Sequence, residues 1–358
     1  MSEQSKAAKS EKANEVLRIS LDDLETLPPA PPPVVSIEST TNAKSYGSIH
    51  EPAEPAALTQ EKGSFFLKAW VYLGIAGLAG SLLGWAIAEP GYIDGQRDHW
   101  GNIWIIPIIV TLICIGFALA ESIVERSVRK ALIRIGIALP LGVVMSFIFD
   151  GIANMIYGIG LSLCGAAGIQ SFHNPATWIA RGIAWAALGA AGGVIYGIID
   201  RSGKKIGYGA LGGAIGAVVG GLVFDPITFL THGAAPSRAI GFGLLGLTTG
   251  VAMGLVESAL KDRWLYVTSG PLAGKQFILY KPQTVMGSNQ TCDIYLFKDP
   301  EILPQHAVLT QKGSHIYLAA EGPVYLSGQP VRGSRVLESG AVLQLGRYKF
   351  RYQERTRE

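Results

Sequence analysis

The middle of this 358-residue chain has very few charged side chains, because most of the charge lies outside residues 65–260. Charged residues make up only 16% of the whole sequence, against about 25% in typical soluble proteins. The three cysteines (Cys114, Cys164 and Cys292) are far apart and form neither a metal-binding nor a disulfide pattern. A net charge of +3 is too small to indicate a nucleic-acid partner. These scarcities exclude a disulfide scaffold and favour a membrane protein.

The sequence also lacks the motifs by which enzymes are usually recognised. We find no nucleophile–base pairing, phosphate-binding loop, metal-ligand spacing or nucleotide fingerprint. The glycine-rich runs at 189–197 and 209–221 do not follow a strand, so they are poor candidates for nucleotide binding. We therefore predict a protein that is not an enzyme and that needs no cofactor or metal.

Residues 1–63 are rich in Ser, Glu, Ala and Pro and contain few aromatic side chains. Such a segment cannot bury enough apolar surface to fold alone, so it is predicted to be a disordered cytoplasmic tail. Residues 1–20 carry no apolar core, which argues against a secretory signal.

Residues 64–260 contain six apolar segments long enough to cross a bilayer, which requires about 20 residues. The predicted spans are 66–88, 103–122, 134–160, 177–199, 206–225 and 238–260, of which the fifth is the least hydrophobic. Basic residues gather in every second loop, at 122–134, at 200–206 and after the last span. The positive-inside rule then places both termini in the cytoplasm, and we expect a bacterial-type inner or plasma membrane.

Small residues recur four positions apart in every span, which places them on one helix face and lets backbones approach closely, as in a glycine zipper. Among these runs are Gly189-Gly193-Gly197, Gly212-Gly216-Gly220 and Gly246-Gly250-Gly254. An acid follows each span, which indicates three tandem hairpins with an acid at each outer and each inner end. The acids are Glu89, Glu121, Asp150, Asp200, Asp225 and Glu257. The pattern leaves open whether the glycine faces pair within one chain or between two copies.

Acids near a membrane can mark an ion path, so a channel or transporter is one alternative function. However, all six acids are predicted to lie near helix ends, and no span carries an ionisable residue at its predicted centre. A tightly packed six-helix scaffold is the favoured interpretation.

Residues 263–358 change character abruptly, because short alternating runs separated by turn residues replace the long apolar segments. Strands are predicted at 264–268, 275–280, 292–297, 306–310, 314–320, 323–326, 341–345 and 347–353. Many short strands at this spacing are typical of an all-β antiparallel sandwich. The fold class is therefore multi-domain, with a disordered tail, an all-α membrane bundle and an all-β module.

Five motifs of this last region resemble the forkhead-associated (FHA) domain family, in the family's order. They are Gly270–Phe277, Met286-Gly287-Ser288 followed by Cys292–Leu296, Pro300–Ala307, Tyr325–Val331, and Leu337–Gly340 with Leu343–Gly346. The resemblance covers the C-terminal quarter only and implies a protein-binding module. Gly287, His306 and Gly328 match positions that are structural in the family.

The positions that bind phosphothreonine in the family are changed here. Ser288 stands where the resemblance implies an arginine, Leu303 where it implies a serine, and Ser327 where it implies an asparagine. Arginine suits phosphate because its planar fork makes bidentate, charge-assisted hydrogen bonds, which serine and leucine cannot. The predicted peptide-binding loops contain Ser288, Asn289, Leu303, Gln305, Ser327, Arg332 and Arg335, of which the two arginines are candidates to replace the lost charge.

These observations predict an integral membrane scaffold or adaptor that presents a cytoplasmic FHA-like module to a protein partner, without a need for phosphate. Two alternatives stay open: a phosphothreonine-dependent signalling adaptor, and a channel or transporter regulated by the module. The partners expected are the lipid bilayer, a protein bound by the module and, through the glycine faces, a second copy of the chain.

Overall fold

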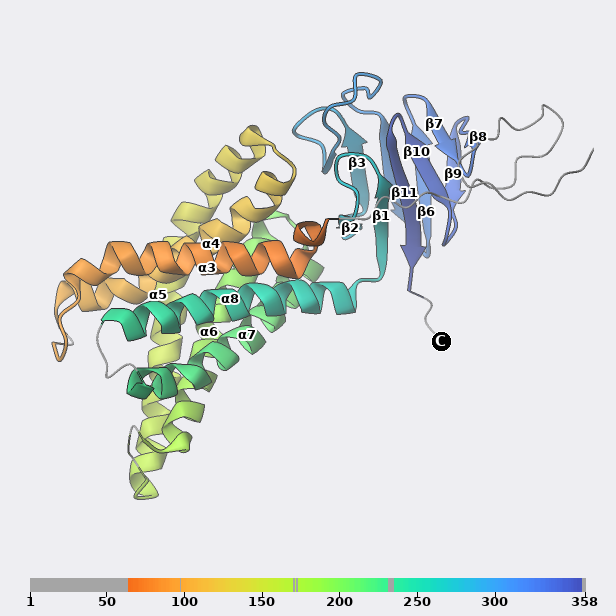
Figure 1. The fold of residues 1–358 in the computed structure, drawn as a ribbon. Coiled ribbons are helices and arrows are strands. Elements are labelled where there is room, and N and C mark those ends of the chain that lie inside the picture. Colours follow the sequence, from red (N-terminus) through yellow and green to blue (C-terminus); the bar gives the residue numbers. More distant parts are fainter. Residues whose placement is uncertain (1–63, 97, 170, 172, 231–234, 356–358) are drawn as a thin grey trace, which may run out of the picture. The chain divides into compact units, whose positions relative to one another are not determined.

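The computed structural model describes residues 64–96, 98–169, 171, 173–230 and 235–355. Within these ranges the chain forms six long helices and then eleven strands (Figure 1). The helices are α3 (Ala69–Ala88), α4 (Trp100–Val124), α5 (Val128–Ala166), α6 (Pro175–Ile199), α7 (Gly203–Leu230) and α8 (Ala235–Leu260). All six are long and apolar enough to span a membrane, as predicted. The tail predicted over 1–63 lies outside the described residues.

Local sequence signals set several helix starts. Asn174 caps α6, because its Oδ1 accepts a hydrogen bond from Ala176 N at 2.9 Å, and Pro175 fills the first helical position. Ser127 caps α5 in the same way, with its Oγ accepting from Lys130 N at 3.3 Å. A short 3-10 turn, η3 (Glu89–Gly91), ends α3 where Pro90 interrupts the helix.

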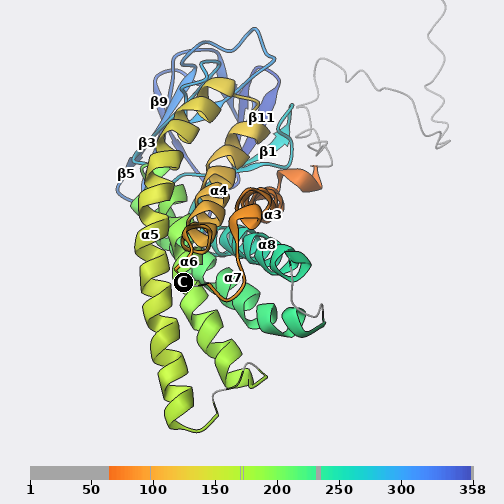
Figure 2. The same cartoon turned by 90° about the vertical axis from the view of Figure 1, so that its left-hand side faces the viewer.

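The helices form a closed ring, because each packs against its neighbours in sequence and α8 returns to α3 (Figure 2). Glycine makes this contact possible. A Cβ at Gly84 would lie 2.7 Å from the Cα of Ile109, and one at Gly212 would lie 2.6 Å from the Cα of Met253. The glycines at 189, 193, 246 and 250 likewise lie against the backbone of a neighbouring helix of the same chain. The glycine faces are therefore occupied within the chain.

Two of the six acids do not lie where the sequence predicts. Helix α5 continues unbroken from Val128 to Ala166, so Asp150 lies inside it, and α7 continues five residues beyond Asp225. The expectation that every acid marks a helix end is wrong for these two residues. The reason is that neither Gly151 nor Pro226 breaks its helix, although both residues are common where helices end.

The C-terminal region is a sandwich of two sheets, as the alternating pattern predicts. One sheet has the strand order β2-β1-β11-β10-β7-β8 and the other β4-β3-β5-β6-β9. The strands are β1 (Arg263–Ser269), β2 (Gln276–Ile278), β3 (Gln283–Gly287), β4 (Ile294–Tyr295), β5 (Ala307–Lys312), β6 (His315–Ala320), β7 (Val324–Leu326), β8 (Gln329–Pro330), β9 (Ser334–Leu337), β10 (Val342–Leu345) and β11 (Tyr348–Glu354). Large side chains such as Tyr348, Phe350 and Leu318 fill the core between the sheets and are fully buried.

Three strands escaped the sequence prediction, namely β3, β8 and β9. Strand β9 exposes three of its four residues, so it lacks the alternation on which strand prediction depends. Strand β3 runs directly into the Gly287-Ser288 turn, so the sequence pattern there indicates a turn rather than a strand. These three strands complete the two sheets that carry the loops of the module.

Candidate functional site

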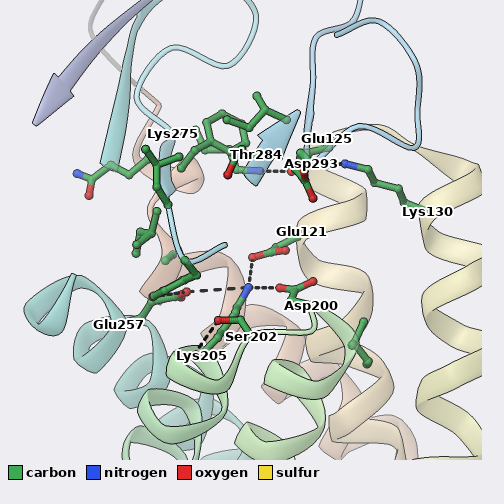
Figure 3. A pocket seen from close by; sticks show the side chains of 18 of the residues that line it. Glu121, Glu125, Lys130, Asp200, Ser202, Lys205, Glu257, Lys275, Thr284 and Asp293 are labelled. Atoms are coloured by element: carbon green, nitrogen blue, oxygen red, sulfur yellow. Dashed lines mark hydrogen bonds and ion pairs between the residues drawn. The ribbon is translucent and has the colours of Figure 1, made fainter. Parts of the chain in front are cut away.

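One acid from each hairpin reaches the same lysine at the inner end of the helices, which is the end that carries Glu121, Asp200 and Glu257. Lys205 Nζ lies 2.7 Å from Glu121 Oε1 and 3.9 Å from Glu257 Oε1, and it also pairs with Asp200 (Figure 3). Lys205 is 4% exposed and arises from the first turn of α7. The three carboxylates are thus held around one buried ammonium group.

A second base and two tyrosines extend this cluster. Arg134 on α5 pairs with Glu121 at 3.0 Å and with Asp200 at 2.8 Å. The Tyr196 hydroxyl donates to Glu121 at 2.7 Å, and the Tyr280 hydroxyl, from the loop after β2, donates to Glu257 at 3.0 Å. Because Glu121, Arg134, Tyr196, Lys205 and Glu257 belong to five different helices, the cluster fastens the inner end of the ring.

The module is joined to the helices beside this cluster. Lys275, just before β2, pairs with Glu125, just after α4, at 2.7 Å, and both side chains are 4% exposed. Lys130 on α5 also pairs with Glu125 at 2.8 Å and donates to the Asp293 carbonyl at 3.3 Å. Gln290 accepts a hydrogen bond from the Arg129 backbone at 3.2 Å. Together these contacts fix the module loop 288–293 against the α4–α5 connection.

Burial and charge act in opposite directions on Glu125. Burial alone raises the pKa of this carboxyl, but the ammonium groups of Lys275 and Lys130 lower it by more, so the pKa lies below its ordinary value. For Tyr280, burial and the nearby Glu257 carboxylate both raise the pKa. Glu125 is therefore ionised and Tyr280 protonated at neutral pH.

The cluster and the junction line a cavity of about 790 Å³ between the helix ends and the module. Five acids and eight bases line it. Every one of the acids is ion-paired (Glu121, Glu125, Asp200, Glu257 and Asp293, with Lys130, Arg134, Lys205, Lys275 and Lys281). Among the described residues no group of His, Cys, Asp and Glu is arranged to hold a metal ion. Ion-paired, hydrogen-bonded charges are typical of a structural network, and none of the described residues in it is arranged as a nucleophile beside a base.

His306 joins the loop before β5 to the turn before β7, in the role that the family resemblance implies. It is 1% exposed. Its Nδ1 accepts from Leu303 N at 3.1 Å, so Nε2 carries the proton and donates to the Pro323 carbonyl at 3.0 Å. Gly322 lies flat on the ring, where a Cβ would be 2.5 Å from Cε1.

Four of the predicted binding residues are brought together by two adjoining loops. Ser288 N donates to the Leu303 carbonyl at 2.9 Å, and Asn289 N donates to the Pro304 carbonyl at 3.2 Å. Gly287 permits this contact, because a Cβ there would lie 2.8 Å from the Pro304 carbonyl carbon. Leu303 is 43% exposed, and Gln305 is exposed beside it. The Asn289 side chain, however, accepts from Thr291 N at 3.0 Å and so closes its own loop.

The other three predicted residues are distributed differently. Ser327 and Gly328 form the β7–β8 turn with positive φ values of 49° and 84°, at the end of β7 away from His306. Val331 N donates a hydrogen bond to the Val324 carbonyl at 2.8 Å, so the chain after the turn runs back toward the start of β7, near His306. The exposed Arg332 follows directly. Arg335 lies opposite Leu318 on the edge strand β9. The arginines are thus nearer the Leu303 loop along the strands than Ser327 is.

The charge cluster was missed by the sequence prediction. Lys205, Lys130 and Arg134 were used there only as topology signals, and the acids as helix ends or as markers of an ion path. Their pairing spans 84 residues between Glu121 and Lys205, and 150 between Glu125 and Lys275. The one signal that could have found it is the repeat itself, because equivalent ends of three hairpins in a ring must converge.

Comparison with known proteins gives a family match in the C-terminal region and two curated relatives. Residues 266–355 match the family model described as "Inner membrane component of T3SS, cytoplasmic domain". The chain is 32% identical over 125 residues to the glycogen accumulation regulator GarA of Mycolicibacterium smegmatis, a match that covers 34% of this chain and 73% of that protein. It is also 32% identical over 89 residues to the oxoglutarate dehydrogenase inhibitor of Corynebacterium diphtheriae, covering 24% of this chain and 61% of that protein.

Among solved structures, the FHA domain of the CT664 protein from Chlamydia trachomatis is similar to this chain. The match is 24% identical, covers 27% of this chain and 100% of that one, and has a TM-score of 0.25. The family-model match covers the residues that form the His306 brace and nearly all of the two-sheet sandwich. Through this region the chain, a membrane protein with six long apolar helices, belongs to the forkhead-associated domain family.

Proposed function

We propose that this protein is an integral membrane scaffold whose module binds a protein partner without requiring phosphate. The division into a membrane domain (64–260), a module (263–358) and a cytoplasmic tail (1–63) is part of this proposal. We also propose that the protein lies in a bacterial-type inner membrane with both termini in the cytoplasm. This placement is supported by the base-rich loops at the inner helix ends and by a family model that describes a cytoplasmic domain of an inner-membrane component.

The observation that carries the proposal is the exposed Leu303 beside the Ser288 turn. A loop that contacts phosphate needs charge or hydrogen-bond donors, whereas Leu303 offers an apolar surface that is 43% exposed. Its neighbours Pro304 and Gln305 are also exposed and uncharged. An exposed apolar contact rimmed by neutral polar groups is suited to a protein surface.

The junction with the helices supports a scaffold rather than a freely tethered receptor. The same loop that contributes Ser288 is held by Gln290 and by Lys130 against the α4–α5 connection. The buried Glu125–Lys275 pair fixes the strand entering β2. A partner bound at Leu303 would therefore be positioned relative to the membrane.

The phosphothreonine alternative rests on Arg332 and Arg335. Both are exposed, and among the described residues neither appears in an ion pair, so both are free to contact an anion. The two readings differ in one measurable property, namely whether removal of phosphate from the partner abolishes binding.

Site-specific photo-crosslinking in intact membranes tests the proposal. A photoreactive residue replaces Leu303 in the full chain, and a matched residue replaces Lys312, which is exposed in β5 at the opposite end of the sheet. We expect an adduct from position 303, none from 312, and no loss after phosphatase treatment before irradiation. Loss of the adduct after phosphatase, together with its loss in an Arg332→Ala/Arg335→Ala variant, would establish phosphate recognition instead. Equal adducts at both positions, or none at 303, would refute the loop as the binding surface.

Transport is less well supported. The inner acids are neutralised by Lys205 and Arg134 rather than lining an open path. Asp150 is the exception, because it lies within α5 and no ion pair involves it in the described part of the chain. Ion flux in liposomes that Asp150→Asn abolishes would establish a channel or transporter.

A further inference from the structure

The cavity between the helix ends and the module has more positive than negative charge in its lining. Its five acids take up five of its eight bases in ion pairs. The other three bases are Lys68, Arg129 and Arg201, and within the part of the chain that the structure describes none of them is in an ion pair. The lining therefore carries three positive charges that its own acids do not neutralise.

Two of these bases stand at neighbouring helix ends. Arg129 lies in the first turn of α5, and Arg201 comes directly after Asp200, which caps the end of α6. Asp200 pairs at 2.8 Å with Arg134, which is only five residues, or about 7.5 Å of helix axis, beyond Arg129. Arg129 and Arg201 are both exposed and both line the cavity, so they flank one corner of it where a ligand has access.

The polarity of the helix makes the position of Arg129 unfavourable in the absence of an anion. The first turn of a helix carries a partial positive charge, which favours anions and disfavours cations. The next residue, Lys130, is compensated by Glu125 at 2.8 Å, whereas no acid among the described residues compensates Arg129. The positive-inside rule accounts for bases at the inner helix ends, but it does not require them to line a cavity without a counter-charge.

An apolar wall continues from Arg129 along the same helix. Ile133 and Ile137 follow it at intervals of four residues, so the three side chains lie on one face of α5, and all three line the cavity. The isoleucines are 51% and 39% exposed. A basic corner beside an exposed apolar wall is complementary to an amphiphile with an anionic headgroup. Basic pockets at the cytoplasmic ends of membrane helices bind such headgroups.

We propose that this cavity binds a phosphate-bearing anion, with the phosphate held by Arg129 and Arg201 at the corner between α5 and α6. Phosphate is the group favoured because a guanidinium fork makes bidentate, charge-assisted hydrogen bonds with it. An anionic phospholipid and a soluble phosphate compound both present this chemistry, and the wall of Ile133 and Ile137 favours the phospholipid. The site is separate from the Leu303 loop. Because Thr291 of the module also lines the cavity, the anion lies at the junction that positions the module.

Lipid binding to the full chain tests the site. In native mass spectrometry of the detergent-solubilised protein, the first phosphatidylglycerol should bind at least about tenfold more tightly than phosphatidylcholine, which has no net charge. Arg201→Gln should weaken phosphatidylglycerol binding about tenfold, and Arg129→Gln/Arg201→Gln should reduce it to the level of phosphatidylcholine. Arg129→Lys/Arg201→Lys keeps both charges and should retain most of the preference.

Arg126→Gln is the matched control for Arg201→Gln. Arg126 is exposed and follows α4 as Arg201 follows α6, with φ values of 52° and 53°, but it does not line the cavity. It should therefore leave phosphatidylglycerol binding unchanged. Circular dichroism of each variant should match that of the wild type, because none of the three arginines is in an ion pair among the described residues.

The soluble source of phosphate is tested separately, with inorganic phosphate and with the isolated glycerol phosphate headgroup. A bound anion raises the Tm of the wild type in micelles that contain no anionic lipid. A rise that Arg129→Gln/Arg201→Gln removes would assign the site to soluble phosphate compounds. No rise, together with tight phosphatidylglycerol binding, would assign it to the lipid. Binding of neither probe, or lipid binding that the double variant leaves unchanged or that Arg126→Gln weakens equally, would overturn the proposal.

Discussion

In the membrane helices glycine lies where neighbouring elements touch, whereas in the module tyrosine, phenylalanine and leucine fill the core. The polar groups are divided in the same way. Charged side chains such as Lys205 and Glu257 are buried at the helix ends, while the core cluster between the two sheets is made of apolar and aromatic side chains. This difference in packing follows from the solvent around each region, which is lipid for the helices and water for the module. Water drives large apolar side chains together, but lipid does not, so helices associate by close backbone contact and polar pairs.

The comparison implies that added volume is most harmful in the ring. Gly193→Leu places a side chain into the backbone of Gly209 and Ala210, and we expect a loss of about 4 kcal/mol or more in the free energy of unfolding. Unfolding of the full chain by SDS in mixed micelles, followed by circular dichroism, measures it. Gly207→Leu should change stability by less than about 0.5 kcal/mol. Equal effects of the two variants would contradict backbone contact as the basis of ring packing.

Removal of the buried ammonium group should be nearly as damaging. Lys205→Met leaves Glu121, Asp200 and Glu257 without their shared partner, and breaking a buried ion pair on one side typically costs about 3–5 kcal/mol. The same SDS titration measures the loss. Lys205→Arg keeps the charge and should restore most of the stability. A methionine variant as stable as wild type would mean that the carboxylates do not depend on Lys205.

In the module the opposite change, loss of volume, should be the harmful one. Leu318 is fully buried between the sheets, and Leu318→Ala should cost about 2–5 kcal/mol because it leaves a cavity. Pulse proteolysis in urea reports on unfolding of the module in the full chain. Val336→Ala, at a residue 38% exposed on the edge strand β9, should cost less than about 0.5 kcal/mol. Comparable losses from the two variants would indicate that the sandwich is not tightly packed.

The junction between the two regions should depend on pH. The pKa of Glu125 is below its ordinary value when the protein is folded, so its ionised form stabilises the fold. That stabilisation is complete above the pKa of an unfolded glutamate, about 4.3, and is lost as the pH falls through the lower folded value. Glu125→Gln should therefore cost about 1–3 kcal/mol at pH 7. The difference from wild type should shrink in acid, as thermal unfolding between pH 7 and pH 3 measures. A difference that persists unchanged at pH 3 would refute the ionised pair.

The sequence predicted the helices and most strands well, because hydropathy and alternation are local properties. The six spans follow from apolar runs, and the His306 loop follows from a motif within a few residues. The ion pairs could not be predicted, because Glu125 and Lys275 are 150 residues apart and only the folded ring and module bring them together. Asp150 was misplaced for a local reason, because Gly151 is compatible with both a helix end and a helix interior. The grouping of Ser327 with Ser288 rests on motif order and stays a prediction.

The smallest expected effect comes from the residue beside Lys205. Lys204 pairs with Asp262 at 2.8 Å, but its side chain is 57% exposed, against 6% for Lys205. Solvent screens an exposed pair and leaves both partners hydrated when it breaks, so Lys204→Met should cost less than about 1 kcal/mol. The SDS titration that measures the stability of Lys205→Met also measures that of Lys204→Met. The two variants remove the same ammonium group at adjacent positions. If Lys204→Met were as damaging as Lys205→Met, burial of the ammonium group among three carboxylates would not explain the stability of the ring. Positive charge at the inner helix ends would then be what stabilises it.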